Sequence, residues 1–180
     1  MNRWSNARRV LVAIVLGTLV GVCPIGAPDA HALVLVSGAC APTFTVSFSP
    51  PMTAVPGAST MSMTGAGTCV ANGSIGTINI TGGMNSAAWS CEAGVAVGAV
   101  SLSFHVPIFN QTYIAATIVA ENVGGVVSVE ITYNLTQLVA VGVFAQSPVS
   151  GAANCATGLG TTTWTGAFVF NDPDTTVAVT

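Results

Sequence analysis

Residues 127–135 read VSVEITYNL, and this stretch decides the fold class. Apolar side chains occupy every second position, and Ser, Glu, Thr and Asn fill the positions between them. A two-residue period places alternate side chains on opposite faces of a β-strand, with one face buried and the other in solvent. No segment after residue 32 shows a sustained helical period. The chain is therefore predicted to be all-β.

The same alternation recurs along the chain, in the ranges 43–49, 60–64, 78–80, 100–106 and 164–170. The expected buried positions are Phe44, Val46, Phe48, Met61, Met63, Ile78, Ile80, Val100, Leu102, Phe104, Val106, Val127, Val129, Ile131, Tyr133, Leu135, Trp164, Phe168 and Phe170. The abundant Thr and Val also favour strands, because their branched side chains are stiff and suit an extended backbone.

Turn-forming residues separate these runs at intervals of about 10 to 15 residues, which is typical of short antiparallel strands. Reversals are predicted between Pro50 and Gly57, at Asn72-Gly73, at Gly82-Gly83, after Pro107 and at Gly124-Gly125. A short final strand is predicted at 176–179, after the turn at 171–174. These features predict eight to ten strands in an antiparallel β-sandwich, immunoglobulin-like or Greek-key, or in a small barrel.

All three basic residues, Arg3, Arg8 and Arg9, lie in the first nine positions. An apolar run of about 13 residues follows at 10–22, shorter than the roughly 20 that a membrane-spanning helix needs. A stretch of small residues then ends at Ala32. This order is typical of a secretory signal peptide. We expect residues 1–32 to be removed by cleavage after Ala32, leaving a single secreted domain at 33–180.

Residues 33–180 contain no lysine or arginine and five acidic residues: Glu92, Glu121, Glu130, Asp172 and Asp174. Nucleic-acid binding requires basic side chains that neutralise phosphates, and attraction to anionic membranes requires them too. Both partner classes are therefore excluded by composition. Low charge combined with high apolar content favours self-association.

Four cysteines follow residue 32: Cys40, Cys69, Cys91 and Cys155. An even number in an exported chain predicts two disulfides, and their wide spacing lacks the C-x-x-C pairs typical of zinc sites. In an antiparallel hairpin the numbers of facing residues have a constant sum. If the hairpin of 43–49 and 59–66 turns near residue 54 or 55, Cys40 faces Cys69, which leaves Cys91 to pair with Cys155.

The histidine and the glutamates are the candidates for catalytic residues. His105 shares a polar strand face with Ser101 and Ser103, but no nucleophile motif such as Gly-x-Ser-x-Gly occurs, so a surface histidine is the favoured interpretation. Two carboxylates among the glutamates Glu92, Glu121 and Glu130 could serve glycoside hydrolysis, whereas isolated solubilising charges are the favoured interpretation.

The remaining candidate residues are also assigned structural roles. Asp172 and Asp174 flank Pro173, and a turn explains them better than a calcium site, which needs six or more oxygen ligands. The aromatic residues Trp89, Trp164, Tyr113 and Tyr133 could line a ligand groove, but their alternating positions favour the core. We predict no catalytic residue, metal or cofactor.

Several short motifs carry a family resemblance: 64–69 (TGAGTC), 142–145 (GVFA), 154–158 (NCATG) and 163–166 (TWTG). In these the chain resembles small exported actinobacterial proteins without an assigned function. That resemblance implies a secreted β-rich domain and transfers no catalytic residue. In addition, residues 41–46 (APTFTV) are similar to the start of the neocarzinostatin-type carrier proteins, which implies an immunoglobulin-like sandwich that binds an apolar chromophore.

Taken together, the sequence favours a secreted, non-catalytic β domain that acts by surface or ligand contact, with the cell envelope as a possible site. Two alternatives stay open. The first is a carrier of a small apolar ligand, which requires a cavity inside the fold. The second is a hydrolase that uses a pair of glutamates, which requires their carboxylates to face each other across a cleft.

Overall fold

A computed structural model describes residues 32–134, 138–147, 155–156 and 158–179. The predicted signal peptide lies outside the described residues except for Ala32, where the first strand begins. The described strands belong to one compact unit, His31–Thr180. Among the described residues, no helix has the length and apolar character needed to cross a membrane.

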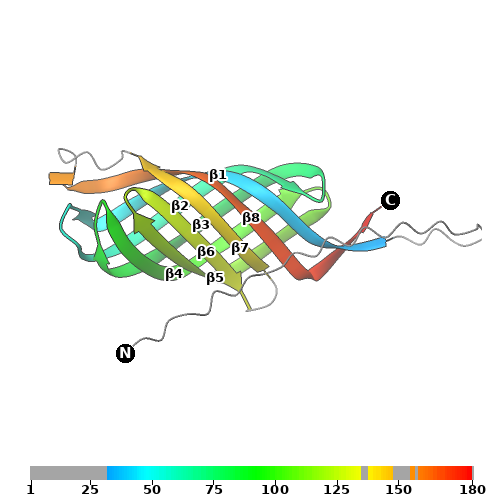
Figure 1. The fold of residues 1–180 in the computed structure, drawn as a ribbon. Coiled ribbons are helices and arrows are strands. Elements are labelled where there is room, and N and C mark those ends of the chain that lie inside the picture. The colour runs from blue at the N-terminus through cyan, green and yellow to red at the C-terminus, as the bar shows by residue number, and fades with distance from the viewer. Residues whose placement is uncertain (1–31, 135–137, 148–154, 157, 180) are drawn as a thin grey trace, which may run out of the picture. The chain divides into compact units, whose positions relative to one another are not determined.

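Eight strands form one closed, antiparallel barrel in which each strand pairs with the next along the chain. The last strand pairs with the first and completes the circle (Figure 1). The strands are β1 (Ala32–Met52), β2 (Gly57–Ala71), β3 (Ser74–Trp89), β4 (Ala93–Val106), β5 (Phe109–Val123), β6 (Val126–Tyr133), β7 (Leu138–Ser147) and β8 (Leu159–Val179). The prediction of a small barrel is confirmed, and the alternative of a sandwich is wrong because β1 pairs along its length with both β2 and β8.

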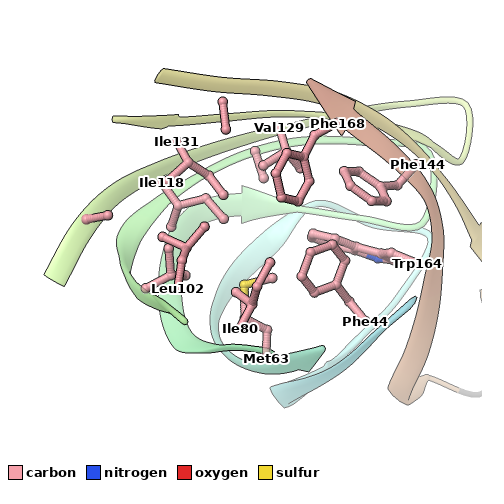
Figure 2. Packing of buried hydrophobic residues seen from close by; sticks show 14 of the residues in the cluster. Phe44, Met63, Ile80, Leu102, Ile118, Val129, Ile131, Phe144, Trp164 and Phe168 are labelled. Atoms are coloured by element: carbon pink, nitrogen blue, oxygen red, sulfur yellow. The ribbon is translucent and has the colours of Figure 1, made fainter. Parts of the chain in front are cut away.

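The interior of the barrel is filled by the apolar side chains of alternate residues. An eight-stranded barrel is just wide enough for side chains to fill it. Figure 2 shows Phe44, Phe144 and Trp164 pointing into this space together with aliphatic side chains from the opposite strands. The predicted core positions that the structure describes are buried, and Tyr133 is partly buried. Leu135 lies outside the described residues.

Aromatic packing explains one interior glycine. The rings of Phe44 and Phe144 meet edge to face with their centroids 5.0 Å apart. A Cβ atom on Gly65, which faces Phe44 from β2, would lie 2.3 Å from Cδ1 of that ring. Any side chain at position 65 would therefore displace the phenyl ring.

Two of the predicted glycine turns are confirmed and one is wrong. Asn72-Gly73 and Gly124-Gly125 join neighbouring strands with positive φ angles, as tight hairpin turns require. Gly82-Gly83 instead lies inside β3. A Cβ atom on Gly82 would lie 2.4 Å from the carbonyl oxygen of Ala99 on β4, so the glycine there provides room between strands and does not reverse the chain.

The predicted separate strand at 176–179 is also wrong, because these residues continue β8. The expected break is instead a register shift: Val36 pairs with Asp172, whereas Leu35 pairs with Thr176. Proline cannot donate to the sheet and is tolerated at such irregularities. Pro173 therefore marks a bulge within one strand.

The two disulfides join Cys40 to Cys69 and Cys91 to Cys155, the pairs expected from the sequence. In the β1–β2 hairpin, the residue numbers of each facing pair, from Gly38 with Ala71 to Ser49 with Thr60, sum to 109. Cys40 and Cys69 face each other in this register. The second bridge ties the β3–β4 turn to the segment between β7 and β8.

Candidate functional site

His105 lies on the outer face of β4 among polar neighbours. Its Nδ1 atom is 3.2 Å from Oδ1 of Asn110, which faces it from β5. Its neighbour on β3 is Thr77, so neither facing residue is an acid. Ser103, two positions away, accepts a hydrogen bond from the hydroxyl of Thr112 at 3.1 Å. These contacts are typical of a polar sheet surface and do not form a Ser-His-acid triad.

The three glutamates occupy separate positions on the outside of the fold. Glu92 lies in the turn between β3 and β4. Glu121 on β5 faces Ser128, and Glu130 on β6 faces Val119, so these two carboxylates are diagonal neighbours on one convex surface. Glycoside hydrolysis needs two carboxyl groups on either side of the scissile bond. Both carboxylates lie on the same outer face of the sheet, so they offer negative charge to a partner and do not face each other across a cleft.

Asp172 and Asp174 differ sharply in their surroundings. Asp174 is exposed, whereas the Asp172 side chain is 1 % exposed inside the barrel. Its Oδ1 accepts hydrogen bonds from the backbone N–H groups of Asp174 and Thr175, both at 3.1 Å, and its Oδ2 accepts one from the Tyr113 hydroxyl. Asp172 therefore uses its oxygens to hold the bulge in β8. No cluster of three or more metal-ligating residues occurs among the residues described.

Tyr113 is kept protonated by its environment. Burial raises the pKa of Tyr113 far above its ordinary value of 10, and the hydrogen bond to Asp172 and its negative charge raise it further. The phenol therefore keeps its proton, and its hydrogen bond to Asp172, at alkaline pH values at which a free tyrosine ionises.

The aromatic residues Trp89, Trp164, Tyr113 and Tyr133 pack in the interior and do not form the alternative ligand groove. Trp89 and Trp164 stack with their ring centroids 6.1 Å apart, and both are buried. Tyr113 and Tyr133 meet edge to face at 5.3 Å. The prediction that these residues belong to the core is confirmed.

Four buried polar atoms near the Trp89–Trp164 pair lack a hydrogen-bond partner among the described residues: Nε1 of Trp89, Nε1 of Trp164, Oε1 of Gln146 and Oγ1 of Thr162. Gln146 faces Trp164 across the β7–β8 pair, and its Nε2 atom contacts Sδ of Met52 at 3.9 Å. A buried polar atom without a partner lowers stability. The polar atoms in this part of the interior thus lack the hydrogen bonds that Tyr113 and Asp172 form.

The outer surface of β8, β1, β2 and β3 is covered with hydroxyl groups. We call it the hydroxyl face: Thr43, Thr45, Ser47, Thr60, Ser62, Thr64, Thr81, Thr161, Thr163 and Thr165. Thr163, Thr45, Thr64 and Thr81 face one another in a row across the four strands. The hydroxyl of Thr60 donates to Oδ1 of Asn85 at 3.0 Å.

The outer surface of β4 to β8 is apolar to an extent that the sequence analysis missed. Nine valines are exposed there by 37 to 65 %, and together they form the valine face: Val95, Val97, Val119, Val123, Val126, Val139, Val141, Val143 and Val169. Glu130 lies in register between Val119 and Val141, and Glu121 faces Val95. The available signal was the range 139–144 (VAVGVF), where both alternating sets are apolar or glycine.

A shallow groove of about 570 Å³ adjoins the valine face. Its lining is mostly small and apolar, with one charged residue: Pro56, Ala87, Ala88, Ala93, Gly94, Val95, Glu121, Asn122 and Val123. The Asn122 amide donates to the carbonyl oxygens of Ser90 and Cys91 and accepts from the Gly125 N–H. These bonds hold Asn122 in the wall of the groove and use its polar atoms. Glu121 is the charged residue of the lining, and its carboxylate can pair with a basic group of a partner.

No protein-family model, curated protein or solved structure matches this chain.

Proposed function

We propose that the protein is an exported, non-catalytic binding protein that acts through the outer surface of its barrel. The main support for this proposal is the contrast between the packed interior of the barrel and the apolar side chains exposed on its outer surface. Side chains occupy the described interior, whereas nine large apolar side chains remain in solvent on the valine face. Large contiguous apolar patches on soluble proteins are typical of interaction sites.

The positions of the acidic groups support a binding role. The carboxylates of Glu121 and Glu130 are neighbours on a convex surface, and the buried Asp172 is occupied by hydrogen bonds from the protein itself. The two disulfides are compatible with an extracellular location, because such bonds persist in oxidising compartments. We place the protein at the cell envelope, where an apolar surface can find a fixed partner.

The proposal is tested by comparing retention at the envelope with release into the medium, in the organism that makes the protein. The test variant is Val141→Thr combined with Val143→Thr, which keeps the branched shape and strand preference while adding two hydroxyls. Val70→Thr is the matched control, since Val70 is 45 % exposed on β2, outside the valine face. We expect the double variant to lower the ratio of bound to released protein about tenfold and the control to leave it unchanged.

Equal retention of all three proteins would contradict a role for the valine face. Native mass spectrometry of the released protein tests the carrier alternative at the same time. A mass equal to that of the oxidised polypeptide supports surface binding, whereas a co-purifying small apolar molecule would favour the carrier. Hydrolysis of a glycan that is abolished by Glu121→Gln or Glu130→Gln would favour the hydrolase.

A further inference from the structure

We infer that the valine face and its groove bind a cationic amphipathic segment of another protein. In this arrangement, basic side chains of the partner meet Glu121 and Glu130, and apolar side chains of the partner cover the valines and enter the groove. The inference rests on the proposed function and names the chemistry of its partner.

Charge complementarity determines this choice. The valine face carries two exposed carboxylates and no positive charge, because residues 33–180 contain no lysine or arginine. Glu130 is flanked on both sides by valines, Val119 and Val141. When a partner excludes water from this surface, the effective dielectric constant falls. The electrostatic attraction between each carboxylate and a basic group beside it therefore becomes stronger. An uncharged apolar partner would instead leave both carboxylates desolvated and unpaired.

The same charges disfavour a second copy of this chain as the partner. A symmetric dimer brings identical surface patches together. On this face it would bring Glu121 and Glu130 of one copy toward those of the other, with no basic side chain in residues 33–180 to separate them. Like charges placed opposite each other in an interface oppose its formation.

The spacing of the carboxylates specifies the partner further. Diagonal neighbours on adjacent strands lie about 7–8 Å apart, with a somewhat smaller separation between Cβ atoms. Two basic residues four apart on a helix have Cβ atoms about 5–6 Å apart, and two basic residues on one face of a strand lie about 6.7 Å apart. Long basic side chains span the small remaining difference. The predicted recognition feature is thus a pair of basic residues at one of these spacings with apolar neighbours.

The groove provides a place for one of those apolar neighbours. Ala88, Ala93 and Gly94 leave a hollow of about 570 Å³ beside the Glu121 carboxylate. Val95 and Val123 belong to both the groove and the valine face, so a bound segment can contact the two surfaces continuously.

The probe for the test is a fluorescently labelled 18-residue helical peptide of Leu and Lys, with Lys pairs four residues apart on one face. Two matched peptides replace every Lys with Glu or with Gln. Fluorescence anisotropy with the disulfide-intact protein measures the dissociation constants at low and high salt. We expect the Lys peptide to bind, the Glu peptide not to bind, and the Gln peptide to bind at least about tenfold more weakly than the Lys peptide.

Three variants assign the binding to this surface. Glu121→Gln with Glu130→Gln should weaken binding of the Lys peptide about tenfold and reduce its salt dependence, because the paired charges are lost. Ala88→Phe, which fills the groove from an exposed position, should weaken binding about fivefold. Asp174→Asn removes one exposed charge from β8 and should change the dissociation constant less than twofold.

Equal affinity for the three peptides, or unchanged affinity after the double Glu→Gln substitution, would overturn the inference. So would a dimer in sedimentation velocity that Val141→Thr with Val143→Thr dissociates, since a second copy would then cover the face. These failures are distinct from failure of the proposed function. Suppose that the Val141→Thr, Val143→Thr double variant loses envelope retention while the Lys peptide does not bind. The proposed role of the valine face then stands, and the inference that its partner is cationic is wrong.

Discussion

The hydroxyl of Tyr113 on β5 donates a hydrogen bond to Oδ2 of Asp172 on β8 inside the barrel. These strands are not neighbours in the sheet, so the bond crosses the interior. Because Oδ1 of Asp172 is held by two backbone N–H groups of the β8 bulge, the tyrosine ties that bulge to the opposite wall.

Tyr113→Phe should lower the free energy of unfolding by about 2 kcal/mol, because a buried carboxylate loses a hydrogen bond of the charge-assisted kind. Urea denaturation followed by far-UV circular dichroism measures the loss. Tyr133→Phe is the control, since Tyr133 is only partly buried and packs against Tyr113 through its ring. Equal losses in the two variants would show that the Tyr113 hydroxyl contributes no more than the hydroxyl of the partly buried Tyr133.

The same pair predicts loss of stability in alkali. Burial and Asp172 raise the pKa of folded Tyr113 well above 10, whereas the unfolded tyrosine ionises near pH 10. The stabilising contribution is complete below pH 10 and falls as pH rises above it, by about 1.4 kcal/mol per pH unit. Denaturation curves between pH 9 and 11.5 should show this slope in the wild type. In Tyr113→Phe the slope should be smaller by that amount, and an identical slope would refute the assignment.

Gln146→Leu should raise the free energy of unfolding by about 1 kcal/mol. Gln146 is fully buried, and its Oε1 atom has no hydrogen-bond partner among the described residues, so an apolar side chain of similar size removes a desolvation cost. Gln111→Leu, at an exposed position of β5, should change stability by less than about 0.5 kcal/mol. A loss of stability in Gln146→Leu would indicate that Oε1 is satisfied by a buried water.

Gly65→Ala should destabilise the barrel by about 2 kcal/mol, because the added methyl group overlaps the Phe44 ring and the packed interior has little room for it to move. Gly57→Ala tests the same chemical change where nothing lies within 4 Å of the added Cβ atom. That control should be neutral or slightly stabilising. Thermal unfolding measured by differential scanning calorimetry compares the two, and similar shifts in melting temperature would contradict the steric explanation.

Local patterns in the sequence predicted the parts of the fold that local chemistry determines. The alternation in β1 and β2, with one turn between them, determines which residues face each other, and so the Cys40–Cys69 pair could be predicted. Gly82 could not be distinguished from a turn glycine, because the need for room comes from Ala99 on another strand. The choice between sandwich and barrel depended on the pairing of β1 with β8, which no local pattern encodes.

The candidate site was less predictable than the fold. The polar positions of Glu121 and Glu130 were evident from alternation, but their diagonal relation depends on the register of β5 with β6. The valine face was missed because the range 139–143 lacks polar residues between its apolar ones, so no alternation indicated which side chains face solvent. An exposed valine and a buried valine look the same in a sequence until the strand is placed in a closed sheet.

Closure of the sheet through β1 and β8 has a consequence for how the molecule reaches its final form. The two strands that complete the circle come from opposite ends of the described chain, and β8 ends at Val179. Until β1 and β8 pair, the sheet is open and has two unprotected edges. Such edges template intermolecular pairing during slow, long-range folding. Protection of the sheet edges therefore depends on the pairing of the two strands that lie furthest apart in the sequence.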